Sequence, residues 1–232
     1  MAGISALKDE YEIKKGRIRE RLNEFEKFFS EPYSWHYLDN ELKLLPSENN
    51  GNHRLFEELA FCIFTANTSA EMGLKAVDAV RNVLVTGNAK DMTRRLEGIY
   101  RFNNLRPEFI VHTRNYLKNT LNFELRKKIS SFRDKNELRD FFALNKDVKG
   151  LGMKEASHFL RNIGFKGYSI LDKHIINSLH EFGVLPTNDK PKNPKHYIEI
   201  EQKLIDFSKQ IGINMDELDL LLWSRKNGRI LK

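Results

Sequence analysis

A lysine and an aspartate, eighteen residues apart, are the residues of this sequence whose types and spacing best support chemistry. Lys154 falls in the first turn of a predicted helix, where the positive end of the helix dipole is unfavourable for an ammonium ion. The neutral amine is a nucleophile that can attack a sugar C1′ and form a Schiff base. Asp172 is predicted to cap the next helix, where the dipole favours an ionised carboxylate. Beside the sugar, that carboxylate would stabilise oxocarbenium character and accept a proton during the attack.

The sequence VKGLGMKEA, over residues 148–156, predicts a tight turn between two amphipathic helices. Gly150 and Gly152 allow positive φ, and Leu151 between them can pack into the core. Such a turn leaves main-chain N–H groups facing outward at the start of a helix, where they can bind a nucleic-acid phosphate, with Lys149 adding positive charge. The alternative interpretation is an ordinary corner between two helices with solvated lysines.

The spacing of Lys154 and Asp172 allows both to face one cleft. A helix of ten residues leads about 15 Å away from the turn. The following segment, residues 164–171, is long enough to return about 25 Å to the same end. Simpler interpretations are a solvated, phosphate-binding lysine and a plain N-cap, which contributes about 1 kcal/mol to stability.

Almost every periodic stretch of the sequence predicts a helix, and no stretch shows the alternation of a β-strand or the turn of a β-hairpin. The predicted helices cover residues 7–29, 55–66, 70–85, a segment that opens near Pro107 and carries residues 109–117, and residues 136–144, 155–163, 172–182, 195–211 and 215–223. The segment 55–66 is apolar nearly all round and is expected to be buried. The fold class is therefore predicted as all-α, with about ten helices.

Composition excludes several classes of protein. Thirty-nine Lys and Arg residues against 32 Asp and Glu give a net charge of +7, which favours nucleic acid as a partner. The single cysteine, Cys62, excludes an intrachain disulfide and a multi-cysteine zinc or iron–sulfur site. The histidines lack HExxH spacing, which disfavours a catalytic metal. The sequence has neither an apolar run of the roughly 18 to 20 residues that span a bilayer nor a signal-peptide core, so we expect a cytoplasmic protein.

Four stretches together resemble the helix–hairpin–helix DNA glycosylase superfamily, and more narrowly its archaeal-type (type 2) 8-oxoguanine DNA glycosylase/AP lyases. They are VKGLGMKEASHFLRNIGF, SILDKHI, FCIFTANTSAEMG and LDLLLWSRKNGRILK. Any one alone is weak, but their joint occurrence over roughly residues 55–232 is specific. The missing iron–sulfur cysteines disfavour the endonuclease-III and adenine-glycosylase branches, and Lys154 disfavours the monofunctional alkyl-base branch.

The resemblance implies a bifunctional repair enzyme that extrudes 8-oxoguanine from duplex DNA. Lys154 would displace the base and form an imine, Asp172 would assist, and β-elimination would cleave the strand 3′ to the lesion. The partner would be duplex DNA containing 8-oxoguanine, bound by a monomer that is nucleoid-associated in a prokaryote. No cofactor is required, although main-chain carbonyls of the hairpin would hold a structural Na⁺ or K⁺ ion.

The same resemblance implies roles for five further residues. Trp223 would stack on the extruded base, and Lys232 would place either its ammonium or its carboxylate in the base pocket. An acceptor facing N7–H, either the Lys232 carboxylate or a main-chain carbonyl, would reject guanine. Asn67 would enter the space left in the duplex, and Arg101 and Phe102 would contact the orphan cytosine.

The architecture predicted from the resemblance has two helical subdomains flanking a DNA-binding cleft. Residues 61–164, with the helix–hairpin–helix motif, form one, and residues 1–60 and 165–232 form the other. Two alternatives remain open at this point. One is a monofunctional glycosylase for another damaged base, and the other is a helix–hairpin–helix module that binds DNA without catalysis.

Overall fold

The computed structural model of the protein describes residues 2–39, 41–47, 51–225 and 228–232. Within these residues the chain forms eleven α-helices, one 3-10 helix and a two-stranded sheet, which confirms the mainly helical prediction. The elements are α1 (Ala2–Ser30), β1 (Tyr33–Leu38), β2 (Glu41–Pro46), α2 (Gly51–Thr65), α3 (Ala70–Val80), η1 (Arg81–Val83), α4 (Ala89–Leu96), α5 (Leu105–Leu121), α6 (Leu125–Ser130), α7 (Lys135–Ala143), α8 (Met153–Asn162), α9 (Lys173–Glu181), α10 (Pro194–Ile211) and α11 (Met215–Ser224).

The helices begin where polar side chains can satisfy their first N–H groups. Six of them follow a residue whose side-chain oxygen accepts a main-chain hydrogen bond in the first turn: Ser69, Asn88, Asp134, Asp172, Asn193 and Asn214. Pro107 lies in the first turn of α5, as predicted, where its missing N–H is not needed. Local capping chemistry therefore sets many of the boundaries.

The prediction of no β-strand was wrong. Strands β1 and β2 pair in antiparallel register, with Trp35 opposite Leu44. Along β1, buried and exposed residues do not alternate, so the strand lacks the periodicity that sequence reasoning depends on. Strand β1 is buried through Trp35, because the Trp35 ring packs against Phe25 and Phe28 of α1 at centroid distances of 5.8 and 6.3 Å. The short helices α4 and α6 were also missed.

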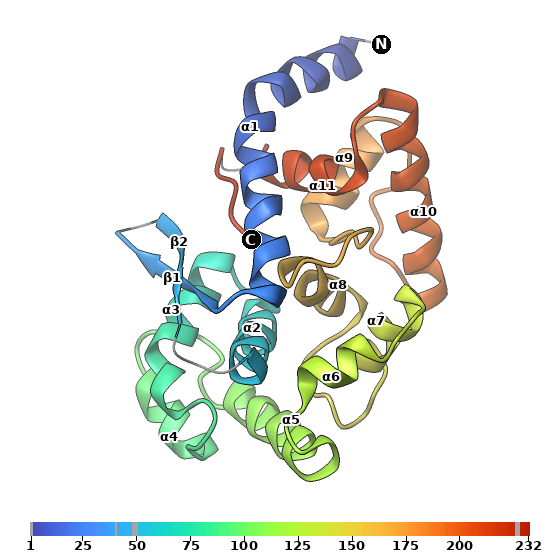
Figure 1. The fold of residues 1–232 in the computed structure, drawn as a ribbon. Helices are drawn as coiled ribbons and strands as arrows, with labels where there is room; N and C mark the ends of the chain where they lie inside the picture. The colour runs from blue at the N-terminus through green and yellow to red at the C-terminus, as the bar shows by residue number, and fades with distance from the viewer. Residues whose placement is uncertain (1, 40, 48–50, 226–227) are drawn as a thin grey trace.

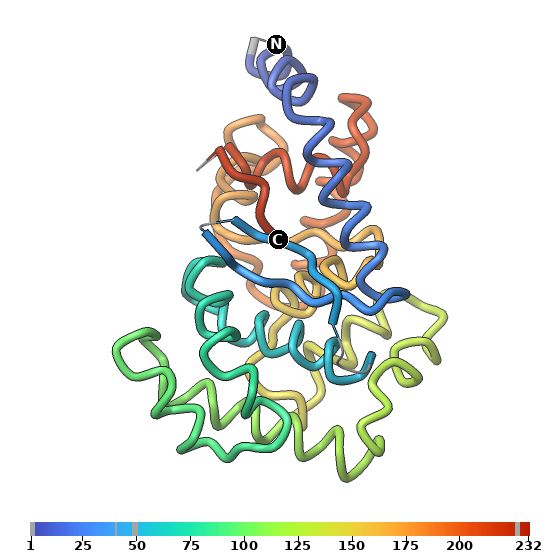
Figure 2. The backbone as a smooth tube through the Cα atoms, turned by 60° about the vertical axis from the view of Figure 1, so that its left-hand side comes forward, coloured from blue at the N-terminus to red at the C-terminus, as the bar shows by residue number. Residues whose placement is uncertain are grey.

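The arrangement of the helices places α2 and α8 in the middle of the molecule. In both views, α1, α9, α10 and α11 gather at one end, and α3, α4 and α5 gather at the other (Figures 1 and 2). Every residue of α2 from Arg54 to Thr65 is buried, which confirms the expected buried helix. The buried hydrophobic side chains form one continuous core. The division into subdomains at residues 61 and 164 stays a prediction.

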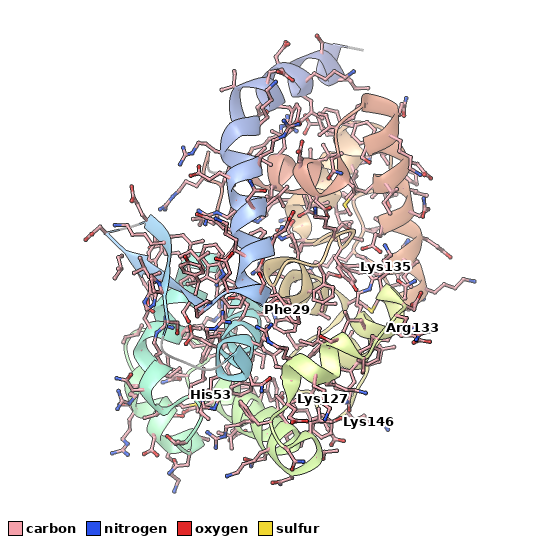
Figure 3. The ribbon with its side chains drawn as sticks, in the orientation of Figure 1. Phe29, His53, Lys127, Arg133, Lys135 and Lys146 are labelled. Carbon is pink, nitrogen blue, oxygen red and sulfur yellow. The ribbon has the colours of Figure 1, made fainter. Side chains whose placement is uncertain are left out.

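The surface carries exposed basic side chains, of which Figure 3 labels Lys127 on α6, Arg133, Lys135 and Lys146. None of the described helices has the length and apolar character needed to cross a membrane.

Gly164, at the end of α8, lets that helix approach α1 closely. Its φ is +98°, and a Cβ placed there would lie 2.7 Å from the carbonyl oxygen of Phe25 and 2.9 Å from the Cα of Glu26. Both atoms belong to the backbone of α1 and cannot move aside cheaply. A side chain at this position would therefore separate α1 from the helix that carries Lys154.

We expect Gly164→Ala to lower the free energy of unfolding by about 3 kcal/mol, because it combines a positive φ with a backbone clash. Gly16→Ala is the matched control: Gly16 lies inside α1 and a Cβ there would meet nothing within 4 Å. That control should stabilise the protein by about 0.5–1 kcal/mol. Urea unfolding measures both, and equal effects would contradict the close approach.

Candidate active site

The turn before α8 has the form that its glycines predict, with one difference. Gly150 has a φ of +84°, and a Cβ there would lie 2.9 Å from Phe109 and 3.1 Å from Ile63. Leu151 is buried, as expected of a residue that packs into the core. Gly152 has a φ of −111°, so the turn uses the positive φ that its glycines allow at Gly150 and not at Gly152. The main-chain N–H of Lys149 donates to the Thr113 hydroxyl at 2.8 Å, which attaches the turn to α5.

Lys154 lies in the first turn of α8 with its side chain 31% exposed. Its ammonium is 3.0 Å from one carboxylate oxygen of Glu155. The other oxygen of Glu155 accepts from the N–H of Gly152 at 3.3 Å. Glu155 thus connects the turn, the start of the helix and the lysine.

Asp172 is the N-cap of α9, as predicted. Its Oδ1 accepts from the N–H groups of His174 and Ile175 at 2.8 and 2.9 Å. Its other oxygen, Oδ2, accepts no hydrogen bond from the described residues. One carboxylate can therefore cap a helix through Oδ1 and keep Oδ2 for a ligand.

Side chains of α10 and α11 fix the irregular segment that leads to Asp172. Four of its main-chain N–H groups donate to them: Gly167 to Asp216 (2.9 Å), Ser169 to Glu201 (3.0 Å), Ile170 to Asp219 (3.0 Å) and Leu171 to the Tyr197 hydroxyl (3.2 Å). The Tyr197 hydroxyl also donates to the carbonyl of Ser169 at 2.7 Å. Without these acceptors the buried N–H groups would each lose a hydrogen bond. The segment, and Asp172 with it, is held in one conformation.

Asp219 is the most buried of these acceptors. Its side chain is 1% exposed and pairs with Arg161 of α8, itself 5% exposed, at 2.8 Å. Burial raises the pKa of Asp219 to about 6, although the attraction of Arg161 opposes the rise. The pair therefore joins α8, which carries Lys154, to the segment that carries Asp172.

A cavity of about 340 Å³ brings together four residues predicted from separate stretches of sequence. It is lined by Lys154 of α8, Asp172 at the start of α9, Trp223 of α11 and Lys232 of the C-terminal segment. Lys154 and Asp172 thus face one cleft, as their spacing allowed. The enclosed volume suits a planar base with a nucleophile and a carboxylate at its edge.

The side chain of Lys232 is anchored to α2. Its ammonium bonds Glu58 of α2 at 2.5 Å, and the two side chains are 1% and 2% exposed. The ammonium also lies 4.1 Å from the centre of the Phe61 ring. Burial lowers the pKa of Lys232, and Glu58 opposes this shift. Of the two Lys232 groups considered for the base pocket, the ammonium is therefore engaged by Glu58. Figure 2 shows the C-terminal end at the middle of the molecule.

His158, one turn after Lys154, also lines the cavity and was not assigned from the sequence. Its pKa lies well below the ordinary value, first because of burial and then because of repulsion from Arg161, Lys154 and Lys232. The imidazole is therefore neutral at pH 7, and it adds no positive charge beside the Lys154 amine.

The three residues implied to act on the duplex lie outside this cavity. Asn67 follows α2 with a φ of +62° and lines a neighbouring groove that also contains Lys154 and Asp172. The guanidinium of Arg101 lies 5.1 Å from the ring of Phe102, which packs against the core. Neither Arg101 nor Phe102 lines the cavity or the groove.

Hydrogen bonds connect the Arg101–Phe102 loop to the end of α2, just before Asn67. The Tyr100 hydroxyl donates to the Phe64 carbonyl at 2.5 Å, and Arg106 donates to the Ala66 carbonyl at 3.0 Å. The roles of all three residues stay predictions.

Sequence reasoning missed the buried charged residues that support the site. A signal was present: Glu58, with its neighbour Glu57, interrupts the apolar stretch of α2 that begins at Leu55, and Asp219 lies among leucines in α11. A carboxylate in such a place requires a partner. The sequence does not say which cation or N–H group provides it.

Comparisons with known proteins found relatives that cover most of the chain. The profile of the family described as 8-oxoguanine DNA glycosylase matches residues 39–213. The 8-oxoguanine DNA glycosylase/AP lyase of Korarchaeum cryptofilum is 43% identical over 182 residues, covering 78% of this chain and 84% of the relative. The enzyme of the same name from Fusobacterium nucleatum is 34% identical over 218 residues, covering 92% and 98%.

Solved structures are similar along the whole chain. A crystal structure of Methanocaldococcus jannaschii 8-oxoguanine glycosylase/lyase in complex with a 15mer DNA containing 8-oxoguanine has a TM-score of 0.82 at 29% identity, covering 100% of both chains. The 8-oxoguanine DNA glycosylase of Thermotoga maritima has a TM-score of 0.79 at 29% identity, covering 99% of this chain and 98% of that one.

The Arg161–Asp219 pair yields a pH-dependent prediction. We expect Asp219→Asn to lower the free energy of unfolding at pH 7 by about 3 kcal/mol, because it leaves a buried guanidinium without its counterion. Between pH 7 and pH 5 this loss should grow by about 1 kcal/mol. The folded wild type takes up a proton on Asp219 in that interval, because its pKa is raised to about 6, and the unfolded chain does not.

Urea unfolding at both pH values measures the difference. Asp206→Asn on α10 is the control, because the Asp206 side chain is 63% exposed. A loss for Asp219→Asn that does not change with pH would contradict the raised pKa.

Proposed function

The chain belongs to the 8-oxoguanine DNA glycosylase family and is an 8-oxoguanine DNA glycosylase/AP lyase, and we propose that Lys154 and Asp172 carry out both of its reactions. The observation that carries this proposal is the single cavity that Lys154, Asp172, Trp223 and Lys232 share. These residues come from four segments that only the fold brings together. The alternative of a binding module without catalysis leaves that convergence unexplained.

The substrate must enter the cavity as an extruded nucleotide, because C1′ of a stacked nucleotide is inaccessible. The hairpin N–H groups around Gly150 and Gly152, with Lys149, would bind the strand backbone. Trp223 would stack on the base. A main-chain oxygen of Lys232 would accept a hydrogen bond from N7–H, which 8-oxoguanine has and guanine lacks. Glu58 would serve this role indirectly, since it fixes the side chain of Lys232.

Base release would begin when the Lys154 amine attacks C1′. The new N–C1′ bond forms as the glycosidic bond breaks, and the base leaves with the bonding electron pair and takes up a proton. The Oδ2 of Asp172 would stabilise the positive charge that develops on the sugar. Loss of the amine proton and opening of the sugar ring then give the imine.

Strand cleavage would follow from the imine by β-elimination. A base removes a proton from C2′, a C2′–C3′ double bond forms, and the C3′–O bond breaks. The strand on the 3′ side leaves with a terminal phosphate. Asn67 would meanwhile occupy the space left in the duplex, and Arg101 and Phe102 would contact the unpaired cytosine. The monomeric state also remains part of the proposal.

Borohydride trapping tests the nucleophile. Wild-type protein and duplex DNA with 8-oxoguanine opposite cytosine should give a covalent complex when the imine is reduced. Lys154→Gln should abolish it, whereas Lys127→Gln, an exposed change on α6, should leave it intact. Base release by wild type without trapping would support the monofunctional alternative instead.

Asp172→Asn separates the chemical role of this residue from its structural one. Asparagine is as good an N-cap as aspartate, so the fold and DNA affinity should change little. Base release should slow by about 100-fold or more, because the neutral amide no longer stabilises charge on the sugar. Single-turnover excision, measured beside a binding titration, gives both quantities, and unchanged excision would remove Asp172 from the mechanism.

A further inference from the structure

A second hollow, of about 500 Å³, adjoins the base cavity and shares Thr68, Lys154, Asp172 and His174 with it. We call it the lysine groove, because Lys173, Lys190 and Lys192 line it beside Lys154. Among the described residues, two carboxylates line the same groove, those of Glu155 and Asp172. Since the base cavity takes the extruded base, the adjoining groove is where the sugar–phosphate backbone of the same nucleotide would run.

The three lysines of the groove are exposed and form no ion pair with a carboxylate of the described residues. Several lysines elsewhere do pair with a carboxylate one turn away on the same helix, for example Lys75 with Glu71 and Lys14 with Glu10. The two carboxylates of the groove are already engaged. Glu155 contacts Lys154 and the N–H of Gly152, and Asp172 caps α9. The groove therefore carries an excess of positive charge that the protein itself leaves uncompensated.

The loop that carries Lys190 and Lys192 is fixed at both ends. At its start, the Asn188 amide donates to the Asn177 side chain of α9 at 3.2 Å. At its end, the N–H of Lys192 donates to His196 of α10 at 3.2 Å, and Asn193 caps α10. Pro191 and Pro194 further restrict the backbone. The two ammonium groups are thus presented from a supported backbone, which lowers the entropy lost on binding an anion.

We propose that Lys173, Lys190 and Lys192 form a binding site for a backbone phosphate that flanks the extruded nucleotide. This inference rests on the proposed function, because the groove opens beside Lys154 and Asp172. If the phosphate is the one on the 3′ side, the site has a further effect on β-elimination. When the C3′–O bond breaks, the departing oxygen keeps the electron pair, and the diester with one negative charge becomes a monoester that carries up to two. Lysines in the groove would stabilise that added charge.

The test combines protein variants with neutral phosphates. The protein variant is the double substitution Lys190→Gln with Lys192→Gln. The DNA is a duplex with a tetrahydrofuran abasic analogue opposite cytosine, in which a methylphosphonate replaces either the 5′ or the 3′ flanking phosphate. For wild type, a methylphosphonate in place of the phosphate that the lysines contact should lower the affinity for the duplex by about tenfold. For the double variant, the same methylphosphonate should change the affinity by less than about twofold.

The double variant should also reduce the slope of log affinity against log salt concentration by about 1, because one phosphate contact is lost. The matched control, Lys127→Gln with Lys209→Gln, makes the same change of charge on α6 and α10, where both lysines lie close to carboxylates (Figure 3 labels Lys127). This control should bind each duplex with the affinity and the salt dependence of wild type.

The position of the sensitive phosphate shows whether the lysines bind the 5′ or the 3′ flanking phosphate. Sensitivity at the 3′ position predicts that the double variant slows strand cleavage at a preformed abasic site more than it slows base release. Sensitivity at the 5′ position supports the phosphate site without the effect on the leaving group. The proposal is overturned if the double variant keeps the wild-type sensitivity at both positions. Borohydride trapping by wild type is run in parallel, so that failure of the proposed function is recognised separately.

Discussion

The active site depends on a buried ion pair between α8 and α11. Arg161 of α8 and Asp219 of α11 are almost fully shielded from water, and Asp219 also accepts the N–H of Ile170. Because the charges are buried, the loss of either partner would leave the other uncompensated, so the two helices and the segment between them are strongly coupled. Lys154 begins one of the helices that the pair joins, and Asp172 ends the segment. The Arg161–Asp219 pair therefore helps to set the positions of Lys154 and Asp172 relative to each other, although it includes neither residue.

A second buried pair does the same for the base pocket. Glu58 of α2 holds the ammonium of Lys232, and the amide of Asn162 donates to the other oxygen of Glu58 at 2.7 Å. Residues 228–232 of the C-terminal segment have no regular secondary structure, so these bonds fix the position of Lys232. A buried charge on each middle helix, Glu58 on α2 and Arg161 on α8, thus helps to position residues that line the cavity. The exposed lysines of the neighbouring groove differ from these buried charges, because no carboxylate of the described residues forms an ion pair with them.

The extent to which the site was predictable varies with the range of the interactions. The roles suggested for Lys154 and Asp172 come from local features, a turn and a helix cap, together with a spacing that limits how far apart they can lie. The resemblance of four stretches to one glycosylase family added Trp223 and Lys232. Glu58, Asp219 and His158 were missed, because their significance depends on partners distant in sequence. The β-hairpin was missed for a related reason, since Trp35 is buried by α1 and not by an alternating pattern along its own strand.

The amino-acid sequence by itself determined most of the helices, the Asp172 cap, the turn before α8 and the chemical types of the reacting residues. These properties depend on hydrogen bonds and steric limits within a few residues of the chain, so local composition is sufficient to specify them. Only the tertiary structure decided that the ammonium of Lys232 lies against Glu58, that Gly152 is extended, and that three uncompensated lysines line a groove beside the cavity. Those outcomes depend on which distant side chains meet, and the free energy of each buried or exposed charge is set by its neighbours in space.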